Sequence, residues 1–209
     1  MTFTEIEAHR EAVTWQPSLL ALDEPDFDPA LTGARRRFLG RGAWVDLVPG
    51  WASGADVLFD AVLDSAPWKA FERPMYERVV DVPRLETRVW HDRPRVLDRM
   101  SRCLGRRYGV QLPSISANLY RDGRDSVAWH GDRIGITRAD AVVAILSLGS
   151  TRTLLLRPDG GGPSIAIPMH SGDLLVQGGT CQRTFEHCVP KRAHAGPRIS
   201  VMFRQAGGN

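Results

Sequence analysis

The spacing of apolar residues predicts a helix that begins near Ser53 and runs to about Ser65. Ser53 is a plausible N-cap, because its hydroxyl can accept a hydrogen bond from a backbone N–H of the first turn. Four apolar side chains then recur at helical spacing and form a single stripe. They are Val57, Leu58, Ala61 and Val62. Such a stripe is typical of a helix that covers a sheet.

A second helix is predicted after Pro94, and it runs to about Tyr108. Gly109 follows it and provides a stop. The apolar face of this helix consists of Leu97, Met100, Cys103 and Leu104. We expect the second helix, like the first, to pack on the outer face of a sheet.

Short apolar or alternating runs separated by Gly and Pro make up the rest of the pattern and predict strands. One extended segment is expected over 78–90, interrupted by Pro83. Further strands are expected over 114–120, 126–132, 141–148, 151–157, 165–169, 173–177, 184–189 and 198–204. Many short strands at close spacing favour an antiparallel double-sheet jelly roll. The predicted fold class is therefore mainly β (α+β).

The first 40 or so residues lack a clear period. An acidic, proline-containing patch, LDEPDFDPA, is followed by a basic cluster of Arg35, Arg36, Arg37 and Arg41. We interpret this region as an arm or irregular layer of the same domain, because 209 residues amount to about one domain.

Composition excludes several classes of protein. Hydrophobic residues make up 43% and charged residues 24% of the chain, which is ordinary for a globular protein and unlike a disordered, collagen-like or coiled-coil chain. No run of about 18 apolar residues is present, so no membrane span is expected, and the polar N-terminus does not resemble a secretory signal. Three cysteines are too few for a disulfide framework, so we expect a cytoplasmic location.

The net charge of +3 is compatible with almost any partner, but the kind of base is more informative. Only Lys69 and Lys191 among the 27 basic residues are lysines. Guanidinium groups match carboxylates and phosphates better than ammonium groups do. A general coding bias toward arginine explains the same observation.

Candidate metal ligands lie in the segment Trp129-His130-Gly131-Asp132. Side chains two residues apart on a strand share a face, so His130 and Asp132 point inward together. His187, on a later predicted strand, is the natural third ligand. Two histidines and one carboxylate leave coordination positions open, as a non-haem Fe(II) site requires. The alternative is that these histidines are solvated or hydrogen-bonded within the core.

The last predicted strand has one purely apolar face and one face with two arginines. Ile199, Val201 and Phe203 form the first face; Arg198, Ser200, Met202 and Arg204 form the second. Arginines inside a barrel need anionic partners, because burying an unpaired charge is costly. A dicarboxylate and a metal-bound aspartate would supply them. The alternative is an edge strand whose polar face is exposed to water.

Asn118 and Tyr120 alternate onto one face of the strand over 114–120. An amide and a phenol side by side can hydrogen-bond a carboxylate or a keto acid. A half-buried strand with a tyrosine hydroxyl at its rim would show the same pattern.

Together these residues resemble the AlkB family of Fe(II)- and 2-oxoglutarate-dependent dioxygenases over Ala117 to Arg204. Each motif alone is weak, but they occur in the order of the family. They are NLYRDG at 118–123, HGD at 130–132, SLG at 147–149, GDLL at 172–175, His187, and the R-x5-R spacing of Arg198 and Arg204. RPMY at 73–76 and PRL at 83–85 are similar to the upstream region of the family.

The resemblance implies a double-stranded β-helix, or jelly roll, with two N-terminal covering helices and a nucleotide-recognition lid. Residues 1–110 would form the arm, the helices and the lid, and residues 111–209 the core of one integrated domain. Fe(II) would be bound by His130, Asp132 and His187. The 2-oxoglutarate site would consist of Asn118, Tyr120, Arg198, Ser200 and Arg204, with Arg198 pairing with the distal carboxylate.

The activity implied by the resemblance is oxidative demethylation of N-alkylated bases in DNA, and less strongly RNA. The reaction would require Fe(II), would consume O2 and 2-oxoglutarate, and would release formaldehyde, succinate and CO2. A base inside a duplex cannot reach a buried iron, so the substrate would be single-stranded or flipped out. Two alternatives are a 2-oxoglutarate-dependent hydroxylase of a protein side chain or small molecule, and a non-enzymatic jelly-roll binding module. No protein partner and no membrane is expected.

Four residues are candidate substrate contacts: Trp90 as a stacking residue, and Arg88, Arg133 and Ile134 near the expected mouth. Family members active on methylated bases often carry an acidic residue where this chain has Ile134. Many members also have Asn where this chain has Ser200, which can still donate a hydrogen bond.

Overall fold

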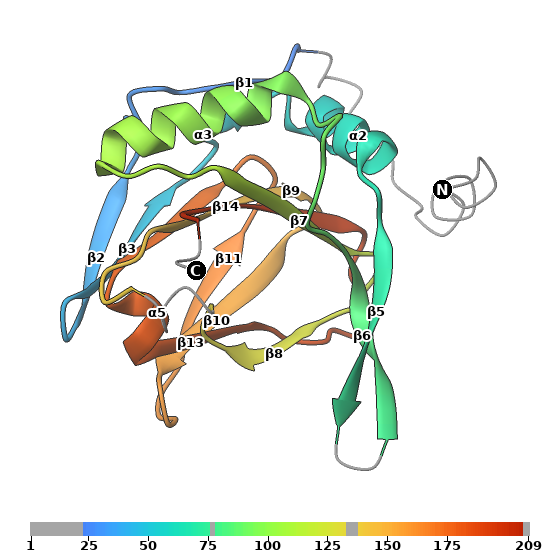
Figure 1. Cartoon of the computed structure of the whole chain (residues 1–209), viewed down its shortest axis with the longest axis vertical. Coiled ribbons are helices and arrows are strands. Elements are labelled where there is room, and N and C mark those ends of the chain that lie inside the picture. The colour runs from blue at the N-terminus through green and yellow to red at the C-terminus, as the bar shows by residue number, and fades with distance from the viewer. Residues whose placement is uncertain (1–22, 76–77, 133–137, 207–209) are drawn as a thin grey trace.

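Two antiparallel sheets face each other, and two helices cover the outer side of the larger sheet (Figure 1). The structure is a computed structural model that describes residues 23–75, 78–132 and 138–206. The sequence-based expectation of a jelly roll with two covering helices is confirmed. No helix among the described residues is both long enough and apolar enough to cross a membrane.

The larger sheet has eight strands and the facing sheet four. In spatial order the larger sheet contains β2 (Arg35–Gly40), β3 (Ala43–Val48), β12 (Leu174–Gly179), β9 (Val143–Gly149), β14 (Arg198–Arg204), β7 (Ser114–Tyr120), β6 (Arg78–Thr87) and β5 (Lys69–Met75). The facing sheet contains β11 (Ile165–Met169), β10 (Arg152–Pro158), β13 (Phe185–Val189) and β8 (Val127–His130). A short ladder pairs β1 (Asp26–Phe27) with β4 (Ala52–Ser53), and a single helical turn, α5 (Cys181–Thr184), precedes β13.

Helix α2 spans Ala55–Ser65, and its N-cap is Gly54 rather than the predicted Ser53. Ser53 is already used in the β1–β4 ladder, where it pairs with Asp26. Gly54 has a φ of 57°, and a Cβ there would lie 2.3 Å from the carbonyl oxygen of Asp23. Only glycine fits this close approach, so it sets the start of the helix.

Helix α3 spans Arg95–Tyr108 as predicted, and Gly109 ends it in the left-handed conformation with a φ of 67°. The residues predicted for its apolar face are the ones that are buried. These side chains join those of α2 and the outer face of the larger sheet in one hydrophobic core. A second core lies between the two sheets and includes Ile145, Leu154, Leu156, Met169 and Met202.

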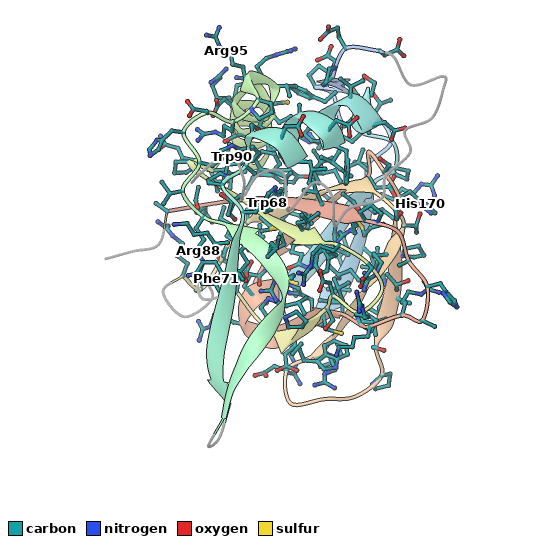
Figure 2. All side chains as sticks on the ribbon, turned by 90° about the vertical axis from the view of Figure 1, so that its right-hand side faces the viewer. Trp68, Phe71, Arg88, Trp90, Arg95 and His170 are labelled. Atoms are coloured by element: carbon teal, nitrogen blue, oxygen red, sulfur yellow. The ribbon has the colours of Figure 1, made fainter. Side chains whose placement is uncertain are left out.

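The segment before residue 50 is more regular than expected. β2 and β3 form a hairpin that pairs with β12, so the irregular layer predicted for the first 40 residues is wrong from Arg35 onward. Strand pairing also crosses residue 110, because β6 pairs with β7. At the other edge of the larger sheet, β5 and β6 extend beyond the jelly roll as a long hairpin (Figures 1 and 2).

Candidate metal centre

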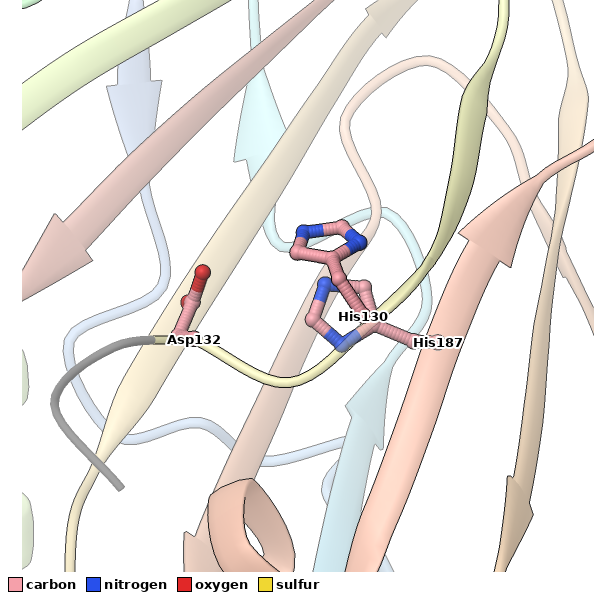
Figure 3. Close-up of side chains that lie close together, drawn as sticks. All are labelled: His130, Asp132 and His187. Atoms are coloured by element: carbon pink, nitrogen blue, oxygen red, sulfur yellow. The ribbon is translucent and has the colours of Figure 1, made fainter. Parts of the chain in front are cut away.

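Strand pairing brings the three predicted metal ligands together (Figure 3). His130 ends β8 and lies directly opposite His187 of β13 in the ladder. Asp132 follows two residues later, just past the end of β8. Each side chain offers one ligand atom, and these atoms all lie within 4.8 Å of one another. The imidazole rings of the two histidines are tilted by 52°, with centroids 4.3 Å apart.

Hydrogen bonds orient His130 and Asp132. His130 donates from Nδ1 to the carbonyl oxygen of Ala128 at 2.9 Å, which leaves its Nε2 lone pair for a metal. The backbone N–H of Asp132 donates to Oε1 of Gln182 at 3.0 Å. Arg204 forms two hydrogen bonds with the Asp132 carboxylate, of 3.0 and 3.3 Å, and a third with Oγ of Ser116. The carboxylate is therefore fixed from the side opposite the histidines.

The charge states of the ligands suit a divalent cation. Burial alone would raise the pKa of Asp132, but Arg204 and the two histidines outweigh it and hold the pKa below its usual value. Burial and the nearby His130 lower the pKa of His187 to about 4, so its imidazole is neutral at pH 7. Two neutral imidazoles and one carboxylate are the donor set of non-haem Fe(II) sites with open positions. The residues present fit Fe(II).

On the larger sheet, Arg198 of β14 is buried and forms no ion pair with any residue that the structure describes. Arg198 is 1% exposed, and its Nε donates to Oγ of Ser147 at 2.9 Å. Its Nη1 has no hydrogen-bond partner among the described residues. Burial lowers the pKa of this guanidinium, which reflects the cost of holding an unpaired charge there. An anionic ligand such as the distal carboxylate of 2-oxoglutarate would relieve that cost.

The other predicted cosubstrate residues lie near Arg198 on adjacent strands of the larger sheet. Ser200 of β14 lies between Asn118 of β7 and Ser147 of β9 in the ladder, so the three share one face of the sheet. The ring of Tyr120 lies 5.3 Å from Cζ of Arg198. Asn118, Tyr120, Ser200 and both arginines of the R-x5-R spacing thus lie on adjacent strands of the larger sheet, and Arg204 reaches across to the metal ligand Asp132.

Sequence reasoning missed several polar residues of this region. Ser147 belongs to a buried strand, where strict alternation with Val143 and Ile145 places it on the inner face, so the signal was present. Gln182 had no signal, because its contact with Asp132 depends on how α5 packs. Arg152, fully buried, lies with its Cζ 5.6 Å from the Tyr120 ring and donates to three backbone carbonyl groups.

Glu86 was also missed. It lies opposite Asn118 in the β6–β7 ladder and is 7% exposed. Its carboxylate accepts from Arg84 at 2.5 Å and from Arg88 at 3.0 Å, so it holds both guanidinium groups near the base of the β5–β6 hairpin. Arg88 also lies over the ring of Phe71, 4.6 Å from its centroid (Figure 2).

Of the substrate candidates, Trp90 is corrected by the structure. It is 3% exposed, packs in the core beneath the helices, and donates from Nε1 to the carbonyl oxygen of Ser65 at 3.2 Å. A side chain enclosed in this way has no face for a nucleobase. Arg88, in contrast, is largely exposed. Arg133 and Ile134 lie outside the described residues.

Comparison with known proteins agrees with this geometry. The profile of the 2OG-Fe(II) oxygenase superfamily matches residues 55–204. The fold is shared with a 2OG-Fe(II) oxygenase family oxidoreductase from Burkholderia pseudomallei, with a TM-score of 0.53 and 16% sequence identity over 79% of this chain and 86% of that one.

Two curated relatives are more similar in sequence. Human alpha-ketoglutarate-dependent dioxygenase alkB homolog 3 is 29% identical over 192 residues, which cover 77% of this chain and 65% of the human protein. DNA oxidative demethylase ALKBH2 of Arabidopsis thaliana is 30% identical over 142 residues, which cover 55% of this chain and 44% of the plant protein. The chain thus spans less than two thirds of either relative, but the profile match extends over most of it. The chain belongs to the 2OG-Fe(II) oxygenase superfamily, and its sequence is similar to these alkB-type dioxygenases.

Proposed function

We propose that this protein is an Fe(II)- and 2-oxoglutarate-dependent dioxygenase that removes N-linked methyl groups from nucleic-acid bases, with DNA as the preferred substrate. The observation that carries the proposal is the His130–Asp132–His187 group on one side of the jelly roll and, on the facing sheet, the buried Arg198, whose Nη1 has no hydrogen-bond partner among the described residues. The names of the relatives, an alkB homolog dioxygenase and a DNA oxidative demethylase, support the reaction and the choice of DNA.

When bound, Fe(II) and 2-oxoglutarate would supply the oxidant for O2 chemistry, with one oxygen atom of O2 going to succinate as CO2 is lost and the other to a C–H bond of the methyl group. The resulting N-hydroxymethyl group would break down to formaldehyde, with the C–N electron pair returning to the base nitrogen and the hydroxyl proton passing to solvent. The protein's part is to bind and orient the reactants and to exclude water.

Each residue has a physical task in this scheme. His130, Asp132 and His187 would hold the metal from one side and leave the other side open. Arg204 keeps Asp132 anionic and in place through two hydrogen bonds. Arg198, with Tyr120 beside it, would select a dicarboxylate cosubstrate, because a buried guanidinium discriminates strongly in favour of an anion.

The substrate experiment is a screen of short oligonucleotides, each with one base methylated at a pairing-edge nitrogen, with mass spectrometry of the strand and formaldehyde as readouts. We expect a loss of one methylene unit of mass, together with succinate above the level formed without substrate. If only proteins or small molecules stimulate succinate formation, the hydroxylase alternative replaces this proposal. If the protein neither takes up Fe(II) nor forms succinate, the enzymatic proposal is wrong. A cytoplasmic location stays a prediction from the sequence.

A further inference from the structure

The β2–β3 hairpin, at the edge of the larger sheet opposite to the β5–β6 hairpin, carries an unusual density of arginine. Its sequence from residue 35 to 41 is RRRFLGR, with four arginines and no acidic residue. All four are exposed. Only Arg36 forms an ion pair with another described residue, and its partner is Asp46.

The register separates these arginines into two groups. Arg36 lies opposite Asp46, on the face that carries Trp44 and Tyr108 and packs toward the helices. Arg35 and Arg37 lie opposite Leu47 and Val45 respectively, and the side chains of Leu47 and Val45 pack in the core between the sheets. Arg35 and Arg37 therefore emerge on the side of the sheet that bears the metal centre.

Hydrogen bonds connect the hairpin directly to the metal centre. Thr180 donates from Oγ1 to the carbonyl oxygen of Arg41 at 2.6 Å, and α5 begins at the next residue. Within α5, Gln182 accepts from the backbone N–H of Asp132. The same short helix exposes Arg183. Two contacts, through Thr180 and Gln182, thus join the hairpin turn to the metal ligand Asp132.

We propose that Arg35, Arg37, Arg41 and Arg183, together called the hairpin patch, bind the phosphate backbone of the substrate strand on the side of the metal centre away from the β5–β6 hairpin. The inference rests on the proposed function, and it adds a second anchoring point for the strand. When the reacting base of a strand enters the jelly roll, the rest of the strand extends away from the site on both sides of that base. One direction leads toward the β5–β6 hairpin and the other toward the β2–β3 hairpin (Figure 1).

Protection of a sheet edge alone does not account for the patch. Single charges suffice to prevent edge-to-edge pairing of strands. Here the arginines come from β2, from the turn after it and from α5, which the Thr180 hydrogen bond joins to that turn, so Arg41 and Arg183 are not on the edge strand. Guanidinium groups without carboxylate partners match the geometry and charge of phosphodiesters.

The test is the salt dependence of binding, measured by fluorescence anisotropy on the full chain with Mn(II) in place of Fe(II). The probes are a labelled 15-nucleotide single strand with one central 1-methyladenine, and the corresponding trinucleotide. For single strands, each phosphate contact contributes about 0.7 to the slope of log K against log salt. We expect the R37A/R41A double variant to lose about 1.4 from that slope with the 15-mer and to bind the trinucleotide as the wild type does.

The matched control is the R102A/R106A double variant, because these two arginines are exposed on α3, in the layer of helices on the other side of the larger sheet. It removes the same charge and should leave the slope unchanged. If the wild type and R37A/R41A show equal slopes, or if both double variants lose the same amount of slope, the hairpin patch does not bind the phosphate backbone.

If the wild type binds and demethylates the 15-mer in either case, the proposed function stands without the patch. If it does neither, the proposed function itself fails.

Discussion

His130 and His187 occupy directly opposed positions in the ladder between β8 and β13, with ring centroids 4.3 Å apart. Backbone pairing, rather than side-chain flexibility, therefore sets the separation of the two imidazoles. A shift of one residue in this register would turn one histidine to the other face of the sheet. The fold therefore fixes the positions of two of the three candidate ligands before any metal binds.

The first prediction concerns these ligands. His130→Ala, Asp132→Ala and His187→Ala should each abolish succinate formation, because two remaining ligands hold a divalent ion too weakly. Mn(II) binding followed by electron paramagnetic resonance should be lost as well, while circular dichroism stays that of the wild type. His170→Ala, at an exposed histidine, is the control and should change neither signal. Near wild-type turnover in any of the three variants would show that the ligand assignment is wrong.

The second prediction concerns Gly131, which links the two ligands at the end of β8. A Cβ at this position would lie 2.7 Å from the carbonyl oxygen of Gln182, the residue whose side chain accepts from the Asp132 N–H. Gly131→Ala should therefore push α5 and Asp132 apart and weaken metal binding by roughly tenfold or more, without unfolding the protein. Titration with Mn(II) measures the effect, and unchanged affinity would mean that the loop tolerates the side chain.

Where local sequence signals agree, they predicted much of the fold and of the candidate site. Helix α3 has a proline before it, a glycine after it and an apolar stripe between, and its bounds and buried face were predicted in full. The strands β7 and β14 alternate cleanly, and the same alternation placed Arg198 and Arg204 on the inner face. His130 was accessible for the same reason, but Asp132 lies beyond the end of β8, and the predicted strand over 126–132 stops at His130.

What the sequence did not reveal depends on tertiary packing. β2 was assigned to an irregular layer because three consecutive arginines hide its alternation, and it forms by pairing with β3. Trp90 was proposed as a stacking residue because sequence does not distinguish an aromatic ring that binds a base from one that fills a core. Gln182 reaches Asp132 across 50 residues of chain, a contact that no local pattern contains.

The third prediction concerns the buried guanidinium of Arg198. Arg198→Met should raise the KM for 2-oxoglutarate by roughly tenfold to a hundredfold, since charge-assisted hydrogen bonds contribute about 1.5–3 kcal/mol. The free protein should lose little stability, because the variant removes a buried charge that lacks a carboxylate partner. Isothermal titration with 2-oxoglutarate and thermal unfolding without it separate the two effects. An unchanged KM would exclude the assigned role.

The fourth prediction tests the structural assignment of Trp90. Trp90→Ala should lower the free energy of unfolding by about 3–5 kcal/mol, as expected for a large aromatic side chain removed from a core. Trp90→Phe should cost less and leave the KM for a methylated oligonucleotide at the wild-type value. Arg88→Ala, at an exposed side chain near the hairpin, should instead raise that KM with little change in stability. A raised KM in Trp90→Phe with unchanged stability would restore the stacking role.

The fifth prediction is a pH dependence of stability that originates far from the metal. Tyr108 at the end of α3 donates from its hydroxyl to Oδ2 of Asp46 at 2.9 Å, and Arg36 binds the same carboxylate from the other side. Burial, together with the Asp46 charge and this hydrogen bond, raises the pKa of Tyr108 above its usual value of 10.0. The folded state thus favours the protonated phenol more than the unfolded state does.

The phenol of Tyr108 has a higher pKa in the folded protein than in the unfolded chain. Below the unfolded-state pKa the phenol is protonated in both states, and the folded state keeps its full advantage. As the pH rises above that value, the advantage is lost. The advantage of the wild type over Tyr108→Phe in free energy of unfolding should therefore be constant up to about pH 10 and shrink above it. Urea titrations of both proteins at pH 8, 9.5 and 11 measure the difference directly. Comparison with the phenylalanine variant cancels the titration of lysines and other tyrosines, which both proteins share. A difference that stays constant through pH 11 would mean that folding does not raise the pKa of Tyr108.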